Sequence, residues 1–292
     1  MPPNTSKPPD PSTTSSYSLP AASHLLTSFT HFLTVAIHNI LYYRHLYPQP
    51  TFLTARSYNL PVHQSRHPLV CAWVRDAVDA VSSQIAAGAV HRLALVLYGP
   101  DPAGAPVLER WMFDVAAFPA WPASVARAHA AHAKGKGRAA TAAFFDRDRD
   151  DHNDDRDDDK NNNSSSSTRA KNTHTRLNWT DLDEQMRAAV RRLAHAAEKM
   201  EPLPEGCTFT VAVELRDESE APIGHPQPWI PTQPNLQTKS KDRDTPGDDV
   251  GGTKTIPLRA VEAGPMFFEC WVEEGKAKAE LNSQSFTTSS SQ

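Results

Sequence analysis

The chain has 292 residues, a formal net charge of −4 at pH 7, 39% hydrophobic residues, and 25 prolines against 12 glycines. The slightly acidic balance excludes the strongly basic surface with which nucleic-acid-binding domains neutralise phosphates, so we expect any link to DNA to run through a partner. The hydrophobic share is below that of a fully packed globular chain. It predicts one folded domain with disordered additions.

The cysteines and the N-terminus indicate a soluble, intracellular protein. Cys71, Cys207 and Cys270 are odd in number and far apart, which predicts reduced thiols in the core. Residues 1–20 have no charged start followed by an apolar run, as a secretory signal would. No window reaches the roughly 18 consecutive apolar residues of a membrane span. We expect residues 1–20 to form a disordered arm.

Two helices and a short strand are expected in the first 90 residues. Apolar residues recur every three or four positions from Ala22 to Leu46, which predicts a long helix with a wide buried stripe. A short strand is expected over Phe52–Arg56. Ser65 and Pro68 are typical of the start of a second helix, and Gly88 is typical of its end. Its predicted buried positions are Leu69, Val70, Trp73, Val74, Ala77, Val78, Val81 and Ile85.

The middle of the chain predicts a central hairpin followed by an insert. Val90–Tyr98 is almost continuously apolar, as in a strand covered on both faces, and a turn leads to a second strand over Val107–Val115. After Trp121 the pattern is lost, and Asp146–Ser167 is almost entirely charged or polar. Such a segment buries too little to offset its ordering entropy. We expect residues 123–176 to be a disordered acidic and Ser-rich insert.

Structure is expected to resume at Thr180, a helix N-cap with Asp183 three residues on. The predicted buried face of this third helix consists of Leu182, Met186, Ala189, Val190, Leu193 and Ala197. An alternating strand follows over 207–215, and two short strands are expected over 255–260 and 266–272. Between them, residues 217–255 are irregular and proline-rich, which favours a functional loop. Trp229, in that loop, needs an apolar contact either from this domain or from a ligand, and both remain open.

Two patterns that suggest metal sites fail on geometry, so no metal or cofactor is predicted. His24, His31, His38 and His45 repeat every seven residues, which on a helix is about 10.5 Å, too far for two rings to share one ion. We interpret them as a polar helix face. The aspartate run from Asp146 has the one-three-five spacing of an EF-hand loop but lacks its central glycine and final glutamate. A solvated acidic linker is favoured.

Catalytic fingerprints are absent, which favours a protein that is not an enzyme. No nucleophile elbow, zinc-protease motif, phosphate-binding loop or dinucleotide fingerprint occurs. An enzymatic site built from scattered carboxylates is the alternative that sequence does not reveal. Arg187, Arg191 and Arg192 lie close to one face of the third helix. They suit either a solvated face or a surface for charged or aromatic partners.

Taken in order, these segments resemble the HORMA-domain family, and within it the accessory subunits of the translesion DNA polymerase zeta. The resemblance covers residues 22–122 and 177–278. The matching segments are FLTVAIHNILYYRHLYP (32–48), Phe52, YNLPV (58–62), His67-Pro68, GCTFTV (206–211), PWI (228–230), IPL (256–258) and WVEE (271–274). The insert at 123–176 and a long stretch around 232–252 depart from the family pattern, and both fall in predicted loops.

The resemblance implies an α+β fold in which three helices pack on a mixed, largely antiparallel sheet, within a domain at 21–278 followed by a loose tail at 279–292. Its C-terminal segment, residues 217–275, would be a safety belt that wraps a proline-containing peptide of the polymerase catalytic subunit. A second surface would recruit a Y-family polymerase scaffold. The implied protein is a nuclear, non-catalytic adaptor that meets DNA only indirectly and no membrane. The alternative within the family is a spindle-checkpoint protein that inhibits an anaphase activator.

The resemblance also assigns roles to individual positions. The implied peptide-binding residues are Trp73, Trp229, Ile256 and Pro257. The implied surface for the second partner consists of Thr255, Leu258, Glu269 and Trp271, although the family has an apolar residue at 255, an amide at 269 and a tyrosine at 271. The implied surface for a HORMA–HORMA homodimer or heterodimer contains Arg187 and Arg192.

Overall fold

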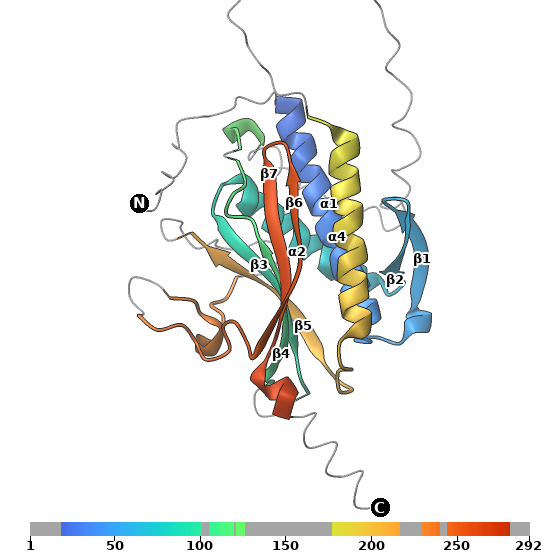
Figure 1. Cartoon of the computed structure of the whole chain (residues 1–292), viewed down its shortest axis with the longest axis vertical. Coiled ribbons are helices and arrows are strands. Elements are labelled where there is room, and N and C mark those ends of the chain that lie inside the picture. Colours follow the sequence, from blue (N-terminus) through green and yellow to red (C-terminus); the bar gives the residue numbers. More distant parts are fainter. Residues whose placement is uncertain are drawn as a thin grey trace, which may run out of the picture.

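The computed structural model describes residues 19–100, 105–119, 121–125, 177–216, 229–239 and 244–280. Three long helices cover one face of a five-stranded sheet, and a two-stranded hairpin lies beside them (Figure 1). Every strand pairing in the described ranges is antiparallel. The predicted α+β class, with three helices packed on a largely antiparallel sheet, is therefore confirmed, although the sheet was expected to be mixed and its described pairs are all antiparallel.

The first helix, α1 (Leu19–Tyr43), is the central element of the core. It begins inside the range predicted as an arm, and its stripe residues Phe29 and Phe32 are completely buried. By length and composition, Ala21–Tyr43 also passes for a membrane span, although no uninterrupted apolar run predicted one. Because 72% of that window is buried inside the fold, the helix is apolar for packing against the sheet and its neighbouring helices.

A hairpin of β1 (Phe52–Ser57) and β2 (Leu60–Ser65) follows the 3₁₀ turn Gln49–Thr51. Sequence analysis predicted only the first strand, because Pro61 interrupts the alternation of the second. Tyr58 and Asn59 form the two-residue turn with φ of 50° and 55°, the left-handed conformation that such hairpins require. The hairpin docks on α1 through the backbone N–H of His63, which donates to Asn39 Oδ1 at 2.8 Å.

Of the four histidines predicted to form a polar face, His24 and His45 are exposed, but His31 and His38 are not. His38 is only 2% exposed, and its Nδ1 accepts a hydrogen bond from the Ser65 backbone N–H. His31 Nε2 lies 2.9 Å from Ser57 Oγ. The interpretation fails for these two because α1 is enclosed by the β1–β2 hairpin, whose strand β2 was not predicted. Burial lowers the pKa of His38 from 6.5 to about 4, so the ring is neutral in the folded protein.

The second helix, α2 (Pro68–Ala86), ends where predicted, with Gly88 at a φ of 73°. The buried stripe was only partly right. Val74, Val78 and Val81 are buried, but Leu69 is 74% exposed and Trp73 and Ala77 are half-buried. Leu69 lies in the first helical turn, where the described fold does not cover the predicted stripe.

The main sheet has the strand order β5-β3-β4-β7-β6. The predicted central hairpin is present as β3 (Val90–Tyr98) and β4 (Val107–Asp114). On one side of it lies β5 (Thr208–Leu215), and on the other lies the hairpin of β6 (Lys254–Ala263) and β7 (Met266–Glu274). The two edge strands of the sheet, β5 and β6, thus both come from the C-terminal half of the chain.

The third long helix, α4 (Trp179–Lys199), has the buried face that was predicted, and all six residues expected there are buried. Its N-cap is Asn178, whose side chain accepts a hydrogen bond from Asp181 N, and not Thr180. Before α4, the described residues include Val125, inside the range predicted as the insert, and its side chain is buried. The rest of the predicted insert, residues 126–176, lies outside the described residues, as do residues 1–18 and 281–292.

Candidate functional site

The strand β5 has a free edge. It pairs with β3 on one side, and among the described strands none pairs with its other side. All of its residues after Thr208 are partly exposed, unlike the buried strands β3 and β4 beside it. A free edge presents unpaired backbone N–H and C=O groups that an added extended peptide can use. The edge is therefore the first element of the candidate site.

An apolar rim borders this edge on the helix side of the sheet. Phe209 of β5 packs edge-on against Trp73 of α2, with ring centroids 4.9 Å apart, and more loosely against Tyr47 at 6.3 Å. Leu69 precedes Trp73 by four residues, so the two side chains share one helix face. This rim of Tyr47, Leu69, Trp73 and Phe209 contains one of the two large apolar side chains that are exposed in the described part of the chain, Leu69.

The segment 229–239 lies across the outer face of the sheet, opposite the helices. Leu236, in a 3₁₀ turn, is 6% exposed and packs with Ala94, Val96 and Met112 of β3 and β4. Trp229 at the start of the segment is half-buried against the main core, and Ile230 next to it is 79% exposed. The predicted belt therefore crosses the sheet in its described part, and Trp229 has at least one contact with this domain.

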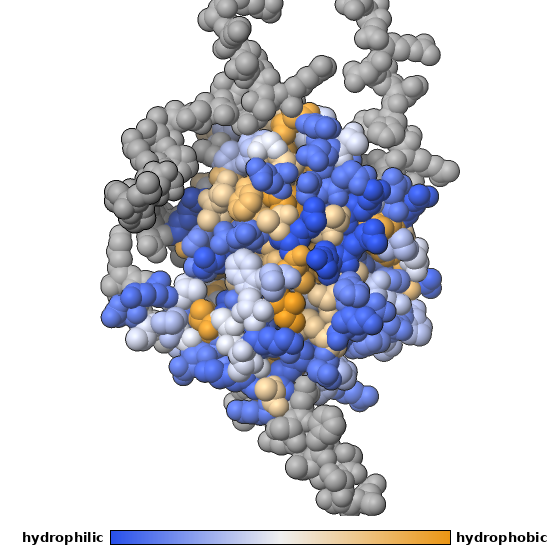
Figure 2. Space-filling view, viewed as in Figure 1, coloured by the Kyte–Doolittle hydropathy of each residue, from blue (hydrophilic) through white to orange (hydrophobic). Residues whose placement is uncertain are grey.

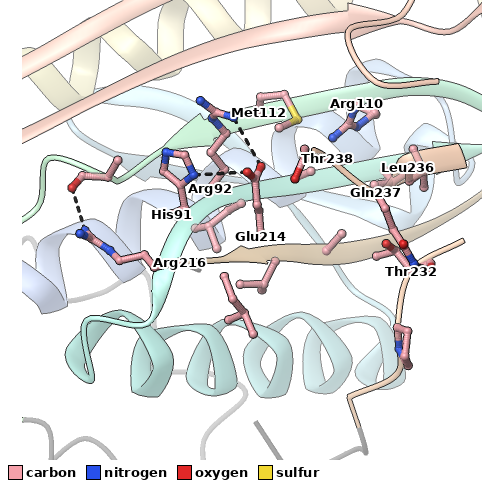
Figure 3. A pocket seen from close by; sticks show the side chains of 18 of the residues that line it. His91, Arg92, Arg110, Met112, Glu214, Arg216, Thr232, Leu236, Gln237 and Thr238 are labelled. Carbon is pink, nitrogen blue, oxygen red and sulfur yellow. Dashed lines mark hydrogen bonds and ion pairs between the residues drawn. The ribbon is translucent and has the colours of Figure 1, made fainter. Parts of the chain in front are cut away.

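A hollow of about 980 Å³ lies between this segment and the sheet (Figure 3). Its walls include Met112, Leu236 and Thr238, and its charged end contains His91, Arg92 and Glu214. The Nδ1 atom of His91 lies 3.2 Å from Glu214 Oε1, and Arg92 Nε donates to Asp114 at 2.8 Å. These ion pairs join side chains of β3, β4 and β5. The charged end of the hollow therefore stabilises the sheet, and its charges are already partnered.

The belt ends in the β6–β7 hairpin, which pairs with β4 at the other side of the sheet. Ile256 and Pro257 lie on β6, at the edge opposite β5, with three strands between. The structure therefore does not bring these two residues together with Trp73, although all were predicted to bind one peptide. The reason is the pairing partner of the hairpin, which sequence patterns do not specify.

Three of the four residues predicted for the second partner share an accessible surface on this hairpin. Thr255 and Glu269 are exposed, and Trp271 is half-buried with its indole N–H donating to Glu273 at 2.8 Å. Leu258 is different, since it is 8% exposed and packs in the main core. A register shift between Pro257 and Arg259 interrupts the alternation of β6 at this position.

The exposed face of α4 is polar. Arg192 is exposed, and Arg187 pairs with Glu184 one turn before it. Figure 2 shows hydrophilic residues in blue along much of this helix. The two arginines predicted for a dimer surface thus lie on an accessible helix face, held to the belt hairpin by the 2.7 Å hydrogen bond from Arg259 to Gln185.

The described residues do not assemble a metal site or a reactive thiol. No group of three or more His, Cys, Asp or Glu side chains in the described ranges has a metal-binding arrangement. Burial raises the pKa of Cys207 to about 11 and that of Cys270 to about 12, so both thiols stay protonated at neutral pH.

Sequence analysis missed Leu69, Tyr47 and Phe209 as site residues, because their spacing resembles that of ordinary core positions.

These features define an α+β domain with a free sheet edge bordered by apolar side chains, and comparison with known proteins identifies its family. The family model described as "HORMA domain" matches residues 26–256, so the chain belongs to the HORMA-domain family. It is 28% identical to the DNA polymerase zeta processivity subunit of Schizosaccharomyces pombe, over 84% of this chain and 91% of the relative.

A further relative is similar in sequence, and two solved structures are similar in fold. The chain is 22% identical to the mitotic spindle assembly checkpoint protein MAD2B of Danio rerio, over 85% of this chain and 90% of that protein. Its fold resembles a chain in the crystal structure of the mitotic checkpoint complex, with a TM-score of 0.52, 18% identity, and coverage of 87% of this chain and 98% of that one. HTP-1 of C. elegans bound to the HIM-3 closure motif has a TM-score of 0.50 and 14% identity, with 88% and 91% covered.

Proposed function

We propose that this protein is a non-catalytic adaptor that clamps an extended peptide of a partner at the free edge of β5. The observation that carries the proposal is the free edge itself, bordered by the rim around Trp73 and lying on the sheet that residues 229–239 cross. The partner that we propose is the catalytic subunit of DNA polymerase zeta, because of the similarity to the processivity subunit of that polymerase. The protein would then act in the nucleus and meet DNA through the polymerase.

The chemistry of strand addition suits this site. A peptide that adds to β5 gains main-chain hydrogen bonds, and its alternate side chains point to opposite faces of the sheet. On the helix face they would meet Leu69, Trp73 and Phe209, and on the outer face they would meet the part of the belt around Leu236. The relative HTP-1, which binds a closure motif of another protein, supports a peptide as the ligand class.

The other surfaces complete the proposal. The hairpin surface with Thr255, Glu269 and Trp271 would face a Y-family polymerase scaffold, with the buried Leu258 supporting it from beneath. Arg187 and Arg192 on α4 would contribute to a homodimer or heterodimer with another HORMA domain. These surfaces do not overlap with β5, so a peptide and a second partner could be held together.

The test is a binding measurement with peptides tiled along the polymerase zeta catalytic subunit of the same organism, using fluorescence anisotropy. We expect one proline-containing tile to bind, and Trp73→Ala and Trp229→Ala to weaken it by about tenfold or more, as truncation of a central aromatic contact does. Trp179→Ala, at the start of α4 and outside the rim and the belt contacts, is the matched control and should bind normally. The proposal fails if no tile binds, or if both site variants bind as tightly as the control.

A spindle-checkpoint role is the second candidate, and the similarity to MAD2B of Danio rerio favours it. It uses the same edge of β5 with a different ligand. Peptides tiled along an anaphase activator, in the same assay, distinguish the two. Tight binding of such a tile, with none from the polymerase, would assign the chain to the checkpoint.

A further inference from the structure

A fully buried ionic cluster lies where α1, β4 and α4 meet. At its centre is Glu109 of β4, with no exposed surface. Arg44 donates to both carboxylate oxygens of Glu109, from Nε at 3.0 Å and from a terminal nitrogen at 2.6 Å. Trp111 Nε1 donates to the same carboxylate at 3.1 Å. Charges this deeply buried persist only when every group is paired.

The Arg44 half of this cluster is built from core elements. Arg44 follows α1, and its guanidinium also donates to the backbone carbonyls of Ala197 at 2.9 Å and Met200 at 3.2 Å, at the C-terminal end of α4. These contacts join α1, β4 and α4 without any residue of the belt. The carboxylate of Glu109 would therefore remain paired if the belt moved.

The remaining member of the cluster comes from the segment after the belt. Lys278 Nζ lies 2.7 Å from Glu109 Oε1 and 3.4 Å from Glu274 Oε2, and its side chain is 2% exposed. Two cations, Arg44 and Lys278, thus balance two carboxylates. Lys278 follows β7 by four residues, so its position depends on where the β6–β7 hairpin lies.

A close backbone approach delivers Lys278 to this position. Gly275 N donates to Leu108 O at 2.8 Å, and Lys278 N then donates to Gly275 O at 3.2 Å. A Cβ atom at Gly275 would lie 2.1 Å from the carbonyl oxygen of Val107. Only glycine lets the chain turn so tightly under the start of β4. The turn and the lysine therefore form one docking unit.

We propose that Lys278 is a positioning residue that fastens the β6–β7 hairpin to β4 and so holds the belt closed. To leave β4, the hairpin has to withdraw the ammonium group from its buried partner and break the Gly275 contact. Glu109 keeps Arg44 and Trp111 when this happens, so the core survives. Lys278 therefore raises the barrier to hairpin release selectively, without being needed for the rest of the sheet.

The consequence for a ligand rests on the proposed function. If a peptide lies at the edge of β5 under the belt, it escapes when the belt loosens, so the contact of Lys278 lengthens its residence. The anchorage of the hairpin itself does not depend on any ligand. The two statements are therefore tested separately.

The experiment is amide hydrogen exchange of the full chain without ligand, comparing wild type with Lys278→Met, which keeps the length and apolar stem but removes the charge. We expect the amides of β7 and Gly275 to exchange at least about tenfold faster, because removing one cation leaves two carboxylates, Glu109 and Glu274, with the single buried cation Arg44, and removing one partner of a buried pair costs more than the 1.4 kcal/mol of a factor of ten. The amides of β3 that bond to β5 should be unchanged. Lys276→Met, an exposed lysine on the same segment, is the matched control.

Lys278→Arg restores a cation and should bring exchange in β7 back towards wild type, and Gly275→Ala should loosen the same amides by displacing the turn. The proposal is overturned if Lys278→Met leaves β7 unchanged. It is also overturned if β3, β5 and β7 all accelerate equally, which would mark general destabilisation. Because no peptide is present, neither result bears on the proposed function. With a bound tile from the binding assay, Lys278→Met should raise the dissociation rate and leave the association rate unchanged.

Discussion

The two sides of the main sheet, at β5 and at the β6–β7 hairpin, differ in what lies beside them. At β5 the backbone is left open, and the apolar rim with Leu69 and Trp73 is exposed or half-buried. At the other side, the chain adds its own hairpin to β4 and fastens the end of it in a buried charge cluster. A free strand edge invites pairing with other chains, and proteins usually cover it. The other edge strand, β6, is also unpaired on its outer side among the described strands, but Pro257 interrupts its row of donors and Arg259 bonds it to α4. Only the edge of β5 has an apolar rim beside it, so it is the edge that the proposed function uses.

The largest effect is expected from removing the charge on which the closed side depends. In Glu109→Gln, Arg44 and Lys278 lose their shared carboxylate and remain buried. The free energy of unfolding should fall by about 3–5 kcal/mol, the usual cost of breaking a buried ion pair. Denaturant titration measures it, with Glu262→Gln, an exposed site on β6, as the control. A loss below about 1 kcal/mol would mean that the cluster does not hold this side together.

Substitution of His38, which lies away from both edges of the sheet, tests how the free energy of unfolding depends on pH. Because burial holds the pKa of His38 at about 4, below its ordinary 6.5, the unfolded chain takes up a proton first as the pH falls. The stability that the neutral His38 contributes is fully present above pH 6.5. It is lost as the pH falls from 6.5 to 4, which lowers the free energy of unfolding by about 3 kcal/mol. Thermal or denaturant unfolding at pH 7 and pH 4 should show that His38→Gln loses correspondingly less stability than wild type. Equal losses in both proteins would contradict a buried, neutral His38.

The smallest effect on stability is expected at the open edge, where function and folding should separate. Leu69→Glu alters a side chain that is 74% exposed, so the free energy of unfolding should change by less than about 0.5 kcal/mol. Its effect on binding of a peptide tile should be larger, about fivefold or more, because a charge replaces apolar contact area beside Trp73. Parallel denaturation and anisotropy measurements decide this. An unchanged affinity would place the peptide elsewhere.

Much of the fold was predictable from local patterns. The three-or-four spacing identified α1, α2 and α4, and all six buried positions of α4 were correct, because one side of a helix faces one neighbour. The apolar run at β3 indicated a strand covered on both faces, and it is covered by helices and by Leu236. Strand β2 was missed because Pro61 breaks its alternation, and the neutral His38 was missed with it, since that strand is what encloses the ring.

Sequence by itself determined the helices, every strand of the main sheet and their order, because periodicity and turn residues act over a few neighbouring positions, and the matching segments indicated the family. Only the tertiary structure decided which edges meet. It placed Ile256 and Pro257 opposite Trp73, buried Leu258, exposed Leu69, and joined Arg44, Glu109 and Lys278 from segments more than 60 residues apart in sequence. Strand neighbours and buried ion pairs depend on contacts between distant segments, which no local pattern encodes. The free edge of β5 and the attachment of the β6–β7 hairpin to β4 are therefore properties of the folded sheet.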